Sequence, residues 1–215
     1  MLVSIVITSY NYGKYLARCV ESCLAQDMPD GSFEVIVVDD CSTDETPSVL
    51  KSFDGIANFC HTRNERNLGV AGTANTGIRI ARGQFVTRVD ADDYVSPGFA
   101  GNLSTQLAAK PNAFGVACDY YHVDEEGNRL RYNSARTKPI SCGIMYRKAE
   151  LEDVGMYSAD WRHREEEELR HRLADQYAIH YLDEALYHYV LHGENKTTQT
   201  EQMALYQQRL EDLYS

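Results

Sequence analysis

Short apolar segments alternate with helical patterns through the first 90 residues, and this alternation restricts the chain to few folds. After the first segment, apolar side chains have the spacing of one helix face, at Tyr15, Leu16, Cys19, Val20, Cys23 and Leu24. Two more helices are expected, one starting at Ser42-Thr43-Asp44-Glu45 and one from about Val70 to Arg82. Strands separated by helices in this way lie parallel in one sheet. We therefore predict an α/β protein with a Rossmann-like central sheet, helices on both faces, and first-half strands at 4–8, 35–38, 58–61 and 84–89.

Polar and acidic residues directly follow three of these predicted strands, at Thr8-Ser9-Tyr10, Asp39-Asp40 and Asp90-Ala91-Asp92-Asp93. Because the carboxyl ends of parallel strands share one edge of a sheet, the three groups are expected to converge there. Clustered carboxylates repel one another unless a cation neutralises them, and oxygen ligands suit Mg²⁺ or Mn²⁺. Such an ion suits a diphosphate, whose oxygens complete its coordination. For the last acidic group taken alone, an acidic loop or a helix N-cap is the alternative.

The second half has a different pattern. A hairpin is expected from residues 114–123 and 129–132, joined by an acidic turn. Further strands are predicted at 140–146, 178–182 and 186–191, a helix over 165–177, and a helical tail over 200–214. Since no repeat or linker interrupts the sequence, residues 1–215 are predicted to form one domain with halves at 1–95 and 96–195 and a tail at 196–215.

The charge balance excludes some partners. The chain has 32 acidic and 21 basic residues, a net charge of −11, which argues against a nucleic-acid surface and against electrostatic docking on anionic lipid. Nucleotide binding stays open because a bound metal supplies positive charge locally. The sequence starts in an apolar strand, so we expect no signal peptide, and no apolar run approaches the roughly 18 to 20 residues of a membrane span. With six scattered cysteines interpreted as reduced, these features predict a cytoplasmic protein.

Five motifs in order resemble those of the family 2 glycosyltransferases, which have the GT-A fold. The resemblance covers roughly residues 2–195. The motifs are Val3-Ser4-Ile5-Val6-Ile7-Thr8-Ser9-Tyr10-Asn11, Val37-Val38-Asp39-Asp40-Cys41-Ser42-Thr43-Asp44, Asn67-Leu68-Gly69 with Asn75-Thr76-Gly77-Ile78, Ala81-Arg82-Gly83, and Asp90-Ala91-Asp92-Asp93. The resemblance implies that the first half binds a nucleotide sugar and that the second half binds the acceptor and carries the catalytic group.

The resemblance implies a donor site at the edge of the sheet. Thr8 and Tyr10 would line the pocket for base and ribose, with Tyr10 placed to stack on the base. Asp40 would accept a hydrogen bond from a ring N–H, which uracil and guanine both offer. A turn carboxylate that caps the next helix is the alternative for Asp40. Asn75 and Gly143 would lie beside the donor.

The same resemblance implies a metal–diphosphate site. Asp90 and Asp92 would hold the Mn²⁺ or Mg²⁺ ion, with Asp92 as the direct ligand, and Asp93 would contact the donor sugar. The segment Tyr189-Val190-Leu191-His192-Gly193-Glu194-Asn195 resembles a C-terminal histidine motif, in which His192 joins the metal. A packing histidine is the alternative for His192.

Glu166 is the candidate catalytic base. The run Arg164-Glu165-Glu166-Glu167-Glu168-Leu169 with Arg172-Leu173 resembles the family's acidic motif, whose second acid is the base. On a helix, Leu169, Leu173 and Tyr177 form one inward stripe, and Glu166 lies roughly 20° from its centre whereas Glu165 lies about 80° away. Glu166 is thus predicted to be the single inward glutamate of the run, with a raised pKa that suits a base.

The sequence departs from the family at two positions. Ala74 stands where many relatives carry Arg or Lys, and Val190 replaces a frequent arginine, so the identity of the donor nucleotide stays open. The expected function is an inverting, metal-dependent transfer of sugar from a nucleotide-diphosphate sugar, preferably a UDP-sugar, to a saccharide or lipid-linked acceptor. The pathway would be synthesis of a polysaccharide, capsule, lipopolysaccharide or glycolipid, with peripheral association at the inner face of the membrane left open. The alternatives are a retaining GT-A enzyme, a nucleotidyltransferase and a non-catalytic sugar-nucleotide-binding subunit.

Overall fold

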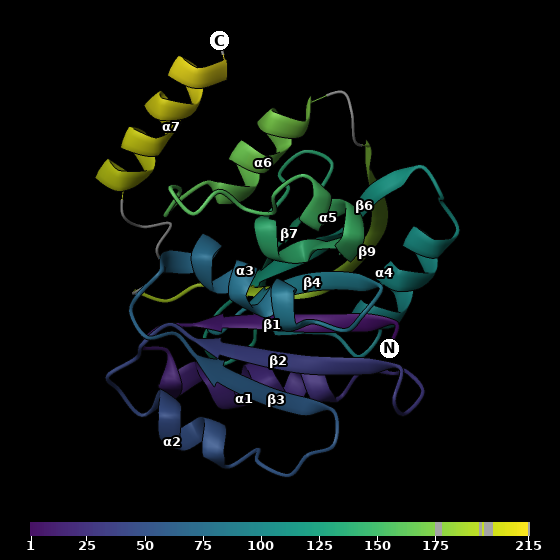
Figure 1. Ribbon diagram of the computed structural model, residues 1–215, viewed down its shortest axis with the longest axis vertical. Helices are drawn as coiled ribbons and strands as arrows, with labels where there is room; N and C mark the ends of the chain where they lie inside the picture. The colour runs from purple at the N-terminus through teal and green to yellow at the C-terminus, as the bar shows by residue number, and fades with distance from the viewer. Residues whose placement is uncertain (175–177, 194, 196–199, 215) are drawn as a thin grey trace.

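The apolar segments of the first half form four adjacent parallel strands in the computed structural model, which describes residues 1–174, 178–193, 195 and 200–214. The strands are β1 Val3–Ser9, β2 Phe33–Asp39, β3 Phe59–Arg63 and β4 Phe85–Asp90, in the order β3-β2-β1-β4 (Figure 1). Helices α1 Gly13–Leu24, α2 Thr46–Lys51 and α3 Gly69–Ile80 connect them. The predicted β-α-β-α-β-α-β order is therefore confirmed. The second helix starts at Thr46 rather than Ser42, because the Asp44 carboxylate accepts the hydrogen bond of the Thr46 N–H at 3.0 Å.

Helices cover both faces of the sheet because its strands alternate their apolar side chains. On one face, Ile5 and Ile7 of β1 pack with α1, α2 and α4 (Phe99–Ala108). On the other face, Val6 packs in a second core with α3, α5 (Lys148–Asp153) and α6 (Glu165–Leu173). The Rossmann-like arrangement with helices on both faces is confirmed. The sequence prediction omitted α4 and α5.

The sheet continues without a break into the second half and becomes mixed there. β8 (Ile144–Arg147) pairs antiparallel with β4 and with β6 (Ala113–Val123), while β9 (Ala178–Val190) runs parallel to β6. The hairpin partner β7 (Arg129–Asn133) pairs with β6 as predicted, and the short strand β5 (Tyr94–Val95) pairs with the end of β9. The nine strands follow the order β3-β2-β1-β4-β8-β6-β9-β5, with β7 beside β6.

Three predicted element boundaries in this half are wrong. The strand predicted at 140–146 begins with a 3₁₀ turn, Ser141–Gly143, before β8. The two strands predicted at 178–182 and 186–191 are one strand, β9. Asp183 and Glu184 lie at a shift in its pairing with β6 and do not end it, because their side chains pair with Arg136 and Asn102. Helix α6 ends at Leu173, and residues 175–177 of its predicted range lie outside the described residues.

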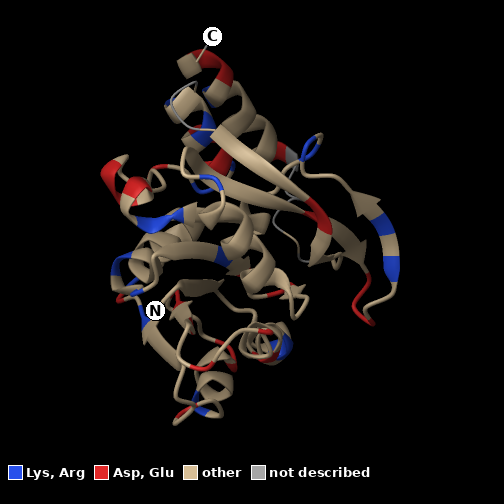
Figure 2. Ribbon diagram, turned by 90° about the vertical axis from the view of Figure 1, so that its right-hand side faces the viewer, with Lys and Arg blue, Asp and Glu red and all other residues tan. Residues whose placement is uncertain are grey.

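The tail forms helix α7 (Thr200–Tyr214), which lies alongside α6 at one end of the molecule (Figure 1). The Tyr214 hydroxyl donates to Glu168 of α6 at 3.0 Å, and Tyr206 contacts the Trp161 ring at 5.6 Å between centroids. Acidic and basic residues are interspersed along the ribbon (Figure 2). Among the described helices, none combines the length and the apolar character needed to cross a bilayer.

Candidate active site

The three polar groups that follow the parallel strands meet at one edge of the sheet, as predicted. Thr8 of β1 lies opposite Asp90 of β4, and Ser9 lies opposite Asp39 of β2. Beyond this edge is a cavity of about 300 Å³. Its walls come from the ends of β1, β2, β4 and β9, the start of α3, the segment before β8, and the start of α6. The lining includes Thr8, Tyr10, Asp40, Arg88, Asp90, Asp92, Asp93, Lys138, Arg162, Arg164, Glu165, Glu166 and Arg170.

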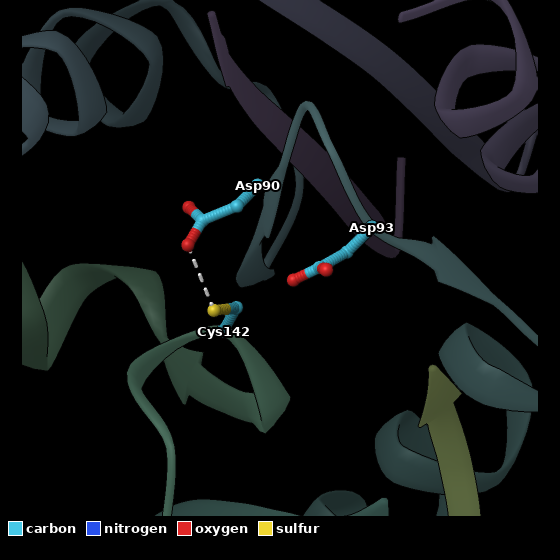
Figure 3. A group of neighbouring side chains, drawn as sticks. All are labelled: Asp90, Asp93 and Cys142. Carbon is cyan, nitrogen blue, oxygen red and sulfur yellow. Dashed lines mark hydrogen bonds between the residues drawn. The ribbon is translucent and has the colours of Figure 1, made fainter. Parts of the chain in front are cut away.

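Asp90 is the most accessible carboxylate of the acidic group, with 29% of its side chain exposed. One oxygen, Oδ1, accepts from the Thr8 hydroxyl at 3.3 Å and lies 3.2 Å from Arg88 Nε. The other, Oδ2, accepts from the Cys142 thiol at 3.0 Å (Figure 3). Burial raises the pKa of the Cys142 thiol well above its usual value, so this sulfur donates a hydrogen bond as a protonated thiol.

Asp93 is buried and anchors β9. Its Oδ2 accepts from the Tyr187 hydroxyl at 2.6 Å, and its Oδ1 accepts from the Val190 N–H at 2.8 Å. Burial raises the pKa of Asp93 well above its usual value, and the negative charges of Asp92 and Asp90 raise it further. These contacts hold β9 in place, and Asp93 also lines the cavity, so its contact with the donor sugar stays a prediction.

Asp92 and His192 meet as expected. His192 Nε2 lies 3.0 Å from Asp92 Oδ2, and the Asn195 amide donates to the same oxygen at 3.5 Å. The His192 ring also stacks on Tyr15 at 4.6 Å between centroids. The histidine is thus both packed and paired with the predicted metal ligand.

The predicted metal set is divided in space. Among the described residues, the ligand atoms that lie within 4.8 Å of one another belong to Asp90, Asp93 and Cys142 (Figure 3), and not to Asp90, Asp92 and His192. The accessible donors at the cavity are still the carboxylates of Asp90 and Asp92, which are hard oxygen ligands. This donor set fits Mn²⁺ or Mg²⁺, whereas the protonated Cys142 thiol does not add a ligand for such an ion.

Asp40 caps a helix, as the alternative interpretation proposed, but not the next helix along the chain. Its Oδ1 accepts from the Leu68 N–H at 2.8 Å and its Oδ2 from the Gly69 N–H at 2.9 Å, at the start of α3. The Asn64 amide donates to Oδ1 at 2.8 Å. Asp40 also lines the cavity, so a further hydrogen bond from a ring N–H remains geometrically open.

Asn75 and Gly143 do not line the cavity. The Asn75 amide donates to the Tyr157 carbonyl at 2.7 Å, and its oxygen accepts from the Tyr157 N–H at 3.2 Å. Asn75 therefore joins α3 to the segment before α6, which is a structural role. Gly143 lies in the 3₁₀ turn, directly after the lining residues Ser141 and Cys142.

Glu166 lies at the start of α6 with 3% of its surface exposed and faces the cavity. Burial raises its pKa from 4.5 to about 7, against the lowering effect of the Arg170 charge. Arg170 Nε is 2.7 Å from Glu166 Oε1, but this buried oxygen has no aligned hydrogen-bond donor. Glu166 is thus an ion-paired carboxyl at the wall of the cavity with a pKa near neutrality.

The prediction that only one glutamate of the run turns inward is wrong. Glu165 and Glu168 are also buried, because arginines cover them. Glu165 pairs with Arg88 of β4 at 2.7 Å, and Glu168 pairs with Arg172 at 2.9 Å. The helical stripe of apolar residues did not contain this information, because polar partners bury these two acids.

Sequence reasoning also missed the cations of the cavity. Lys138, Arg162, Arg164 and Arg170 line it, and Arg88 lies on its floor. Arg63, the cation at the end of β3, does not line the cavity; Arg63 pairs with Asp39 and donates to the Ser42 carbonyl at 2.8 Å. The signal for Arg88 was present in the sequence, since alternation along β4 places it on the same face as Asp90.

Comparison with known proteins identifies the family. The family described as "Glycosyl transferase family 2" matches residues 4–173. The chain belongs to this family. The match covers the whole first half and the second half as far as the end of α6.

Among relatives of this family 2 chain is "Glycosyltransferase GlyG" of Streptococcus pneumoniae, 39% identical over 133 residues, which are 61% of this chain and 43% of the relative. "Chondroitin synthase" of Escherichia coli is 37% identical over 134 residues, 60% of this chain and 18% of the relative. "Poly(ribitol-phosphate) beta-N-acetylglucosaminyltransferase TarS" of Staphylococcus aureus is 38% identical over 97 residues, 45% of this chain and 17% of the relative. The match thus spans less than half the length of each of these relatives.

The solved structure of TarS residues 1–349 in complex with UDP-GlcNAc is similar with a TM-score of 0.78 at 24% identity. The superposition covers 92% of this chain and 61% of that one. Together with the mixed sheet and its two helical layers, this similarity confirms the GT-A fold.

Proposed function

We propose that this family 2 domain transfers a sugar from a UDP-sugar to an acceptor hydroxyl, with inversion at the anomeric carbon and with a divalent metal. The observation that carries the proposal is that Glu166, a buried carboxyl with a pKa of about 7, opens onto the same cavity as Asp90 and Asp92. A base tuned near neutral pH and a carboxylate pair suited to a metal–diphosphate are the two parts that such a transfer requires.

The donor end of the cavity is the edge of the first-half sheet. Tyr10 is partly exposed there and is placed to stack on a base, while Asp40 keeps acceptor capacity toward a ring N–H. A UDP-sugar is preferred because TarS is named as an N-acetylglucosaminyltransferase and its structure is described with UDP-GlcNAc.

A divalent ion held by Asp90 and Asp92 would neutralise charge on the diphosphate leaving group. Lys138, Arg162 and Arg164 are further cations in reach of the donor's phosphates.

Glu166 is the proposed base. In this mechanism, the Glu166 carboxylate takes the proton of the acceptor hydroxyl as the hydroxyl oxygen attacks the anomeric carbon, and the bond from that carbon to the diphosphate breaks on the opposite side. Inversion follows from this in-line geometry. Arg170, beside Glu166, keeps a useful fraction of the carboxyl ionised near neutral pH, because its charge opposes the effect of burial.

The natural acceptor is proposed to be a saccharide. Chondroitin synthase is named for a polysaccharide product, TarS is named for transfer of N-acetylglucosamine to poly(ribitol-phosphate), and GlyG is named as a glycosyltransferase. Because the matched part is less than half of each, the acceptor and the pathway of this chain need direct measurement.

A panel of UDP- and GDP-sugars tests the proposal. The protein is incubated with each donor and a mixed oligosaccharide acceptor set, with Mn²⁺ or with EDTA, and nucleotide release and product anomeric configuration are measured. We expect release only with metal, a preference for one UDP-sugar, and an inverted product. A retained configuration contradicts inversion, release of pyrophosphate indicates a nucleotidyltransferase, and binding without turnover for every donor indicates a non-catalytic sugar-nucleotide binder.

A further inference from the structure

Arg88 is a buried guanidinium at the floor of the cavity. Only 4% of its side chain is exposed, and it lies on β4 between Thr87 and Val89, in the middle of the sheet. A charge in such a place is unfavourable unless acidic groups compensate it and hydrogen bonds hold it. Its surroundings supply both.

The guanidinium joins three separate segments of the chain. Its Nη1 donates to Glu165 Oε1 of α6 at 2.7 Å, and its Nη2 donates to the Ser141 hydroxyl in the 3₁₀ turn at 2.7 Å. Its Nε lies 3.2 Å from Asp90 Oδ1 on its own strand. The Arg88 guanidinium therefore contacts both Asp90, at the end of β4, and Glu165, the first residue of α6.

The contact with Glu165 separates the two adjacent acids of α6 by role. Both acids line the cavity, but Glu165 is held by Arg88 of β4, whereas Glu166 is paired with Arg170 of its own helix, has no contact with β4 among the described ion pairs, and has a pKa raised to about 7. The planar guanidinium makes its three contacts in fixed directions, so the charge-assisted hydrogen bond from Nη1 to Glu165 restricts how the first turn of α6 can rotate relative to β4. The rotation of α6 about its axis thus depends on Arg88.

We propose that Arg88 is a positioning residue that ties Asp90 and Glu165 together, and so holds Glu166 at a fixed place relative to the donor. The proposal rests on the proposed function, because it needs Glu166 to be the base. Its rival is that Arg88 only neutralises buried acids and stabilises the fold.

The two explanations differ in a double-mutant cycle. Arg88→Met removes the charge, Glu165→Gln removes its partner, and the double variant removes both while keeping similar side-chain volumes. Arg88→Lys keeps the charge but lacks the planar fork. Arg147→Met is the matched control, since Arg147 is also largely buried but donates to the carbonyls of Leu107, Lys110 and Ala113, away from the cavity.

Each variant is measured for melting temperature, for UDP affinity with Mn²⁺, and for turnover of the UDP-sugar that the wild type uses best. We expect Arg88→Met to lose stability, and the double variant to recover a melting temperature within about 3 °C of the wild type. Turnover should stay about 10- to 100-fold low in the double variant and in Arg88→Lys, because α6 is no longer held in register. Turnover is compared at saturating UDP-sugar, because losing the Arg88 contact to Asp90 also changes UDP affinity, and Arg147→Met should keep normal turnover per folded molecule.

Recovery of turnover together with stability in the double variant overturns the proposal in favour of charge neutralisation, and so does normal turnover in Arg88→Lys. If the double variant does not fold, the result for Arg88→Lys decides. A wild type that turns over no donor is a failure of the proposed function itself, and it is recognised before any variant is compared.

Discussion

Glu166 shows how one residue carries the proposed chemistry. A base must be ionised to accept a proton, and burial raises the pKa of Glu166 to about 7. We therefore expect turnover to rise with pH through about 7 and to level off above it. Glu166→Gln should lower turnover by about 10²- to 10⁴-fold and leave UDP affinity unchanged. Steady-state kinetics between about pH 5 and pH 9 measure this. A larger loss of turnover in Glu165→Gln than in Glu166→Gln would mean that Glu165, and not Glu166, is the base.

The same residue makes stability depend on pH. Its pKa is about 7 in the folded chain and 4.5 without burial, so between these values the folded state holds a proton that the unfolded state has released. Stability from this group is therefore lost as the pH rises through that window, by up to about 3 kcal/mol. We expect urea unfolding of Glu166→Gln to show a flatter decline over this range. Glu152→Gln, at a more exposed position of α5 that does not line the cavity, is the control and should keep the wild-type slope.

Asp40 tests whether a capping residue also reads the nucleotide. Asp40→Asn replaces an acceptor that serves Leu68 and Gly69 by an amide, and should lower the free energy of unfolding by about 1 to 2 kcal/mol. If Asp40 also accepts from a ring N–H, UDP affinity falls by about tenfold, a change that titration calorimetry resolves. Asp44→Asn is the control, because Asp44 caps α2 and does not line the cavity. Equal UDP affinity in the two variants would leave Asp40 with capping alone.

At the scale of elements, the sequence predicts well where hydrophobic periodicity is decisive. The strands of the first half and helix α1 are fixed by apolar side chains that pack against apolar partners, so the pattern contains most of the necessary information. The convergence of Thr8, Asp40 and Asp90 follows from parallel pairing alone. Glu165 and Asn75 could not be placed in this way, because their partners are polar groups about 77 and 82 residues away in the sequence.

Helix α7 packs beside the site through Tyr206 on Trp161, Arg209 over the same ring and Tyr214 on Glu168, and Met203 of α7 lines the cavity. Leu210 is its most buried residue, with 3% of its surface exposed, while Leu205 on the same helix is 62% exposed. We expect Leu210→Ala to weaken the docking of α7 by about 2 to 4 kcal/mol and to speed proteolytic cleavage near residues 200–214. Leu205→Ala should leave cleavage at the wild-type rate. Equal cleavage in both variants would mean that α7 is not held by this face.

At the scale of the whole molecule, the chain is strongly acidic, and among the described residues its cavity places five Lys and Arg side chains beside seven Asp and Glu side chains. The net charge of −11 does not reveal the arginines that line the cavity. Arg88 and Arg170 each pair with a glutamate of α6, while Asp90 and Asp92 remain the donors suited to a cation. Composition therefore describes the average surface, and the binding chemistry depends on a few residues that the fold brings together.

The excess of acidic over basic side chains in the cavity predicts that nucleotide binding depends on metal. A diphosphate beside Asp90 and Asp92 is repelled unless a divalent ion lies between them, so UDP should raise the melting temperature clearly with Mn²⁺ or Mg²⁺ and only weakly with EDTA. At a ligand concentration about 100 times the dissociation constant, the stabilisation is about 2.7 kcal/mol.

Asp92→Ala should remove the difference in UDP stabilisation between metal and EDTA. His192→Ala should reduce it if the pairing of His192 with Asp92 at 3.0 Å serves the ion, and leave it unchanged if the ring only packs on Tyr15. Asp183→Ala, an exposed carboxylate of β9 away from the cavity, is the matched control and should behave as the wild type. Equal stabilisation by UDP with metal and with EDTA would contradict the metal-dependent mechanism.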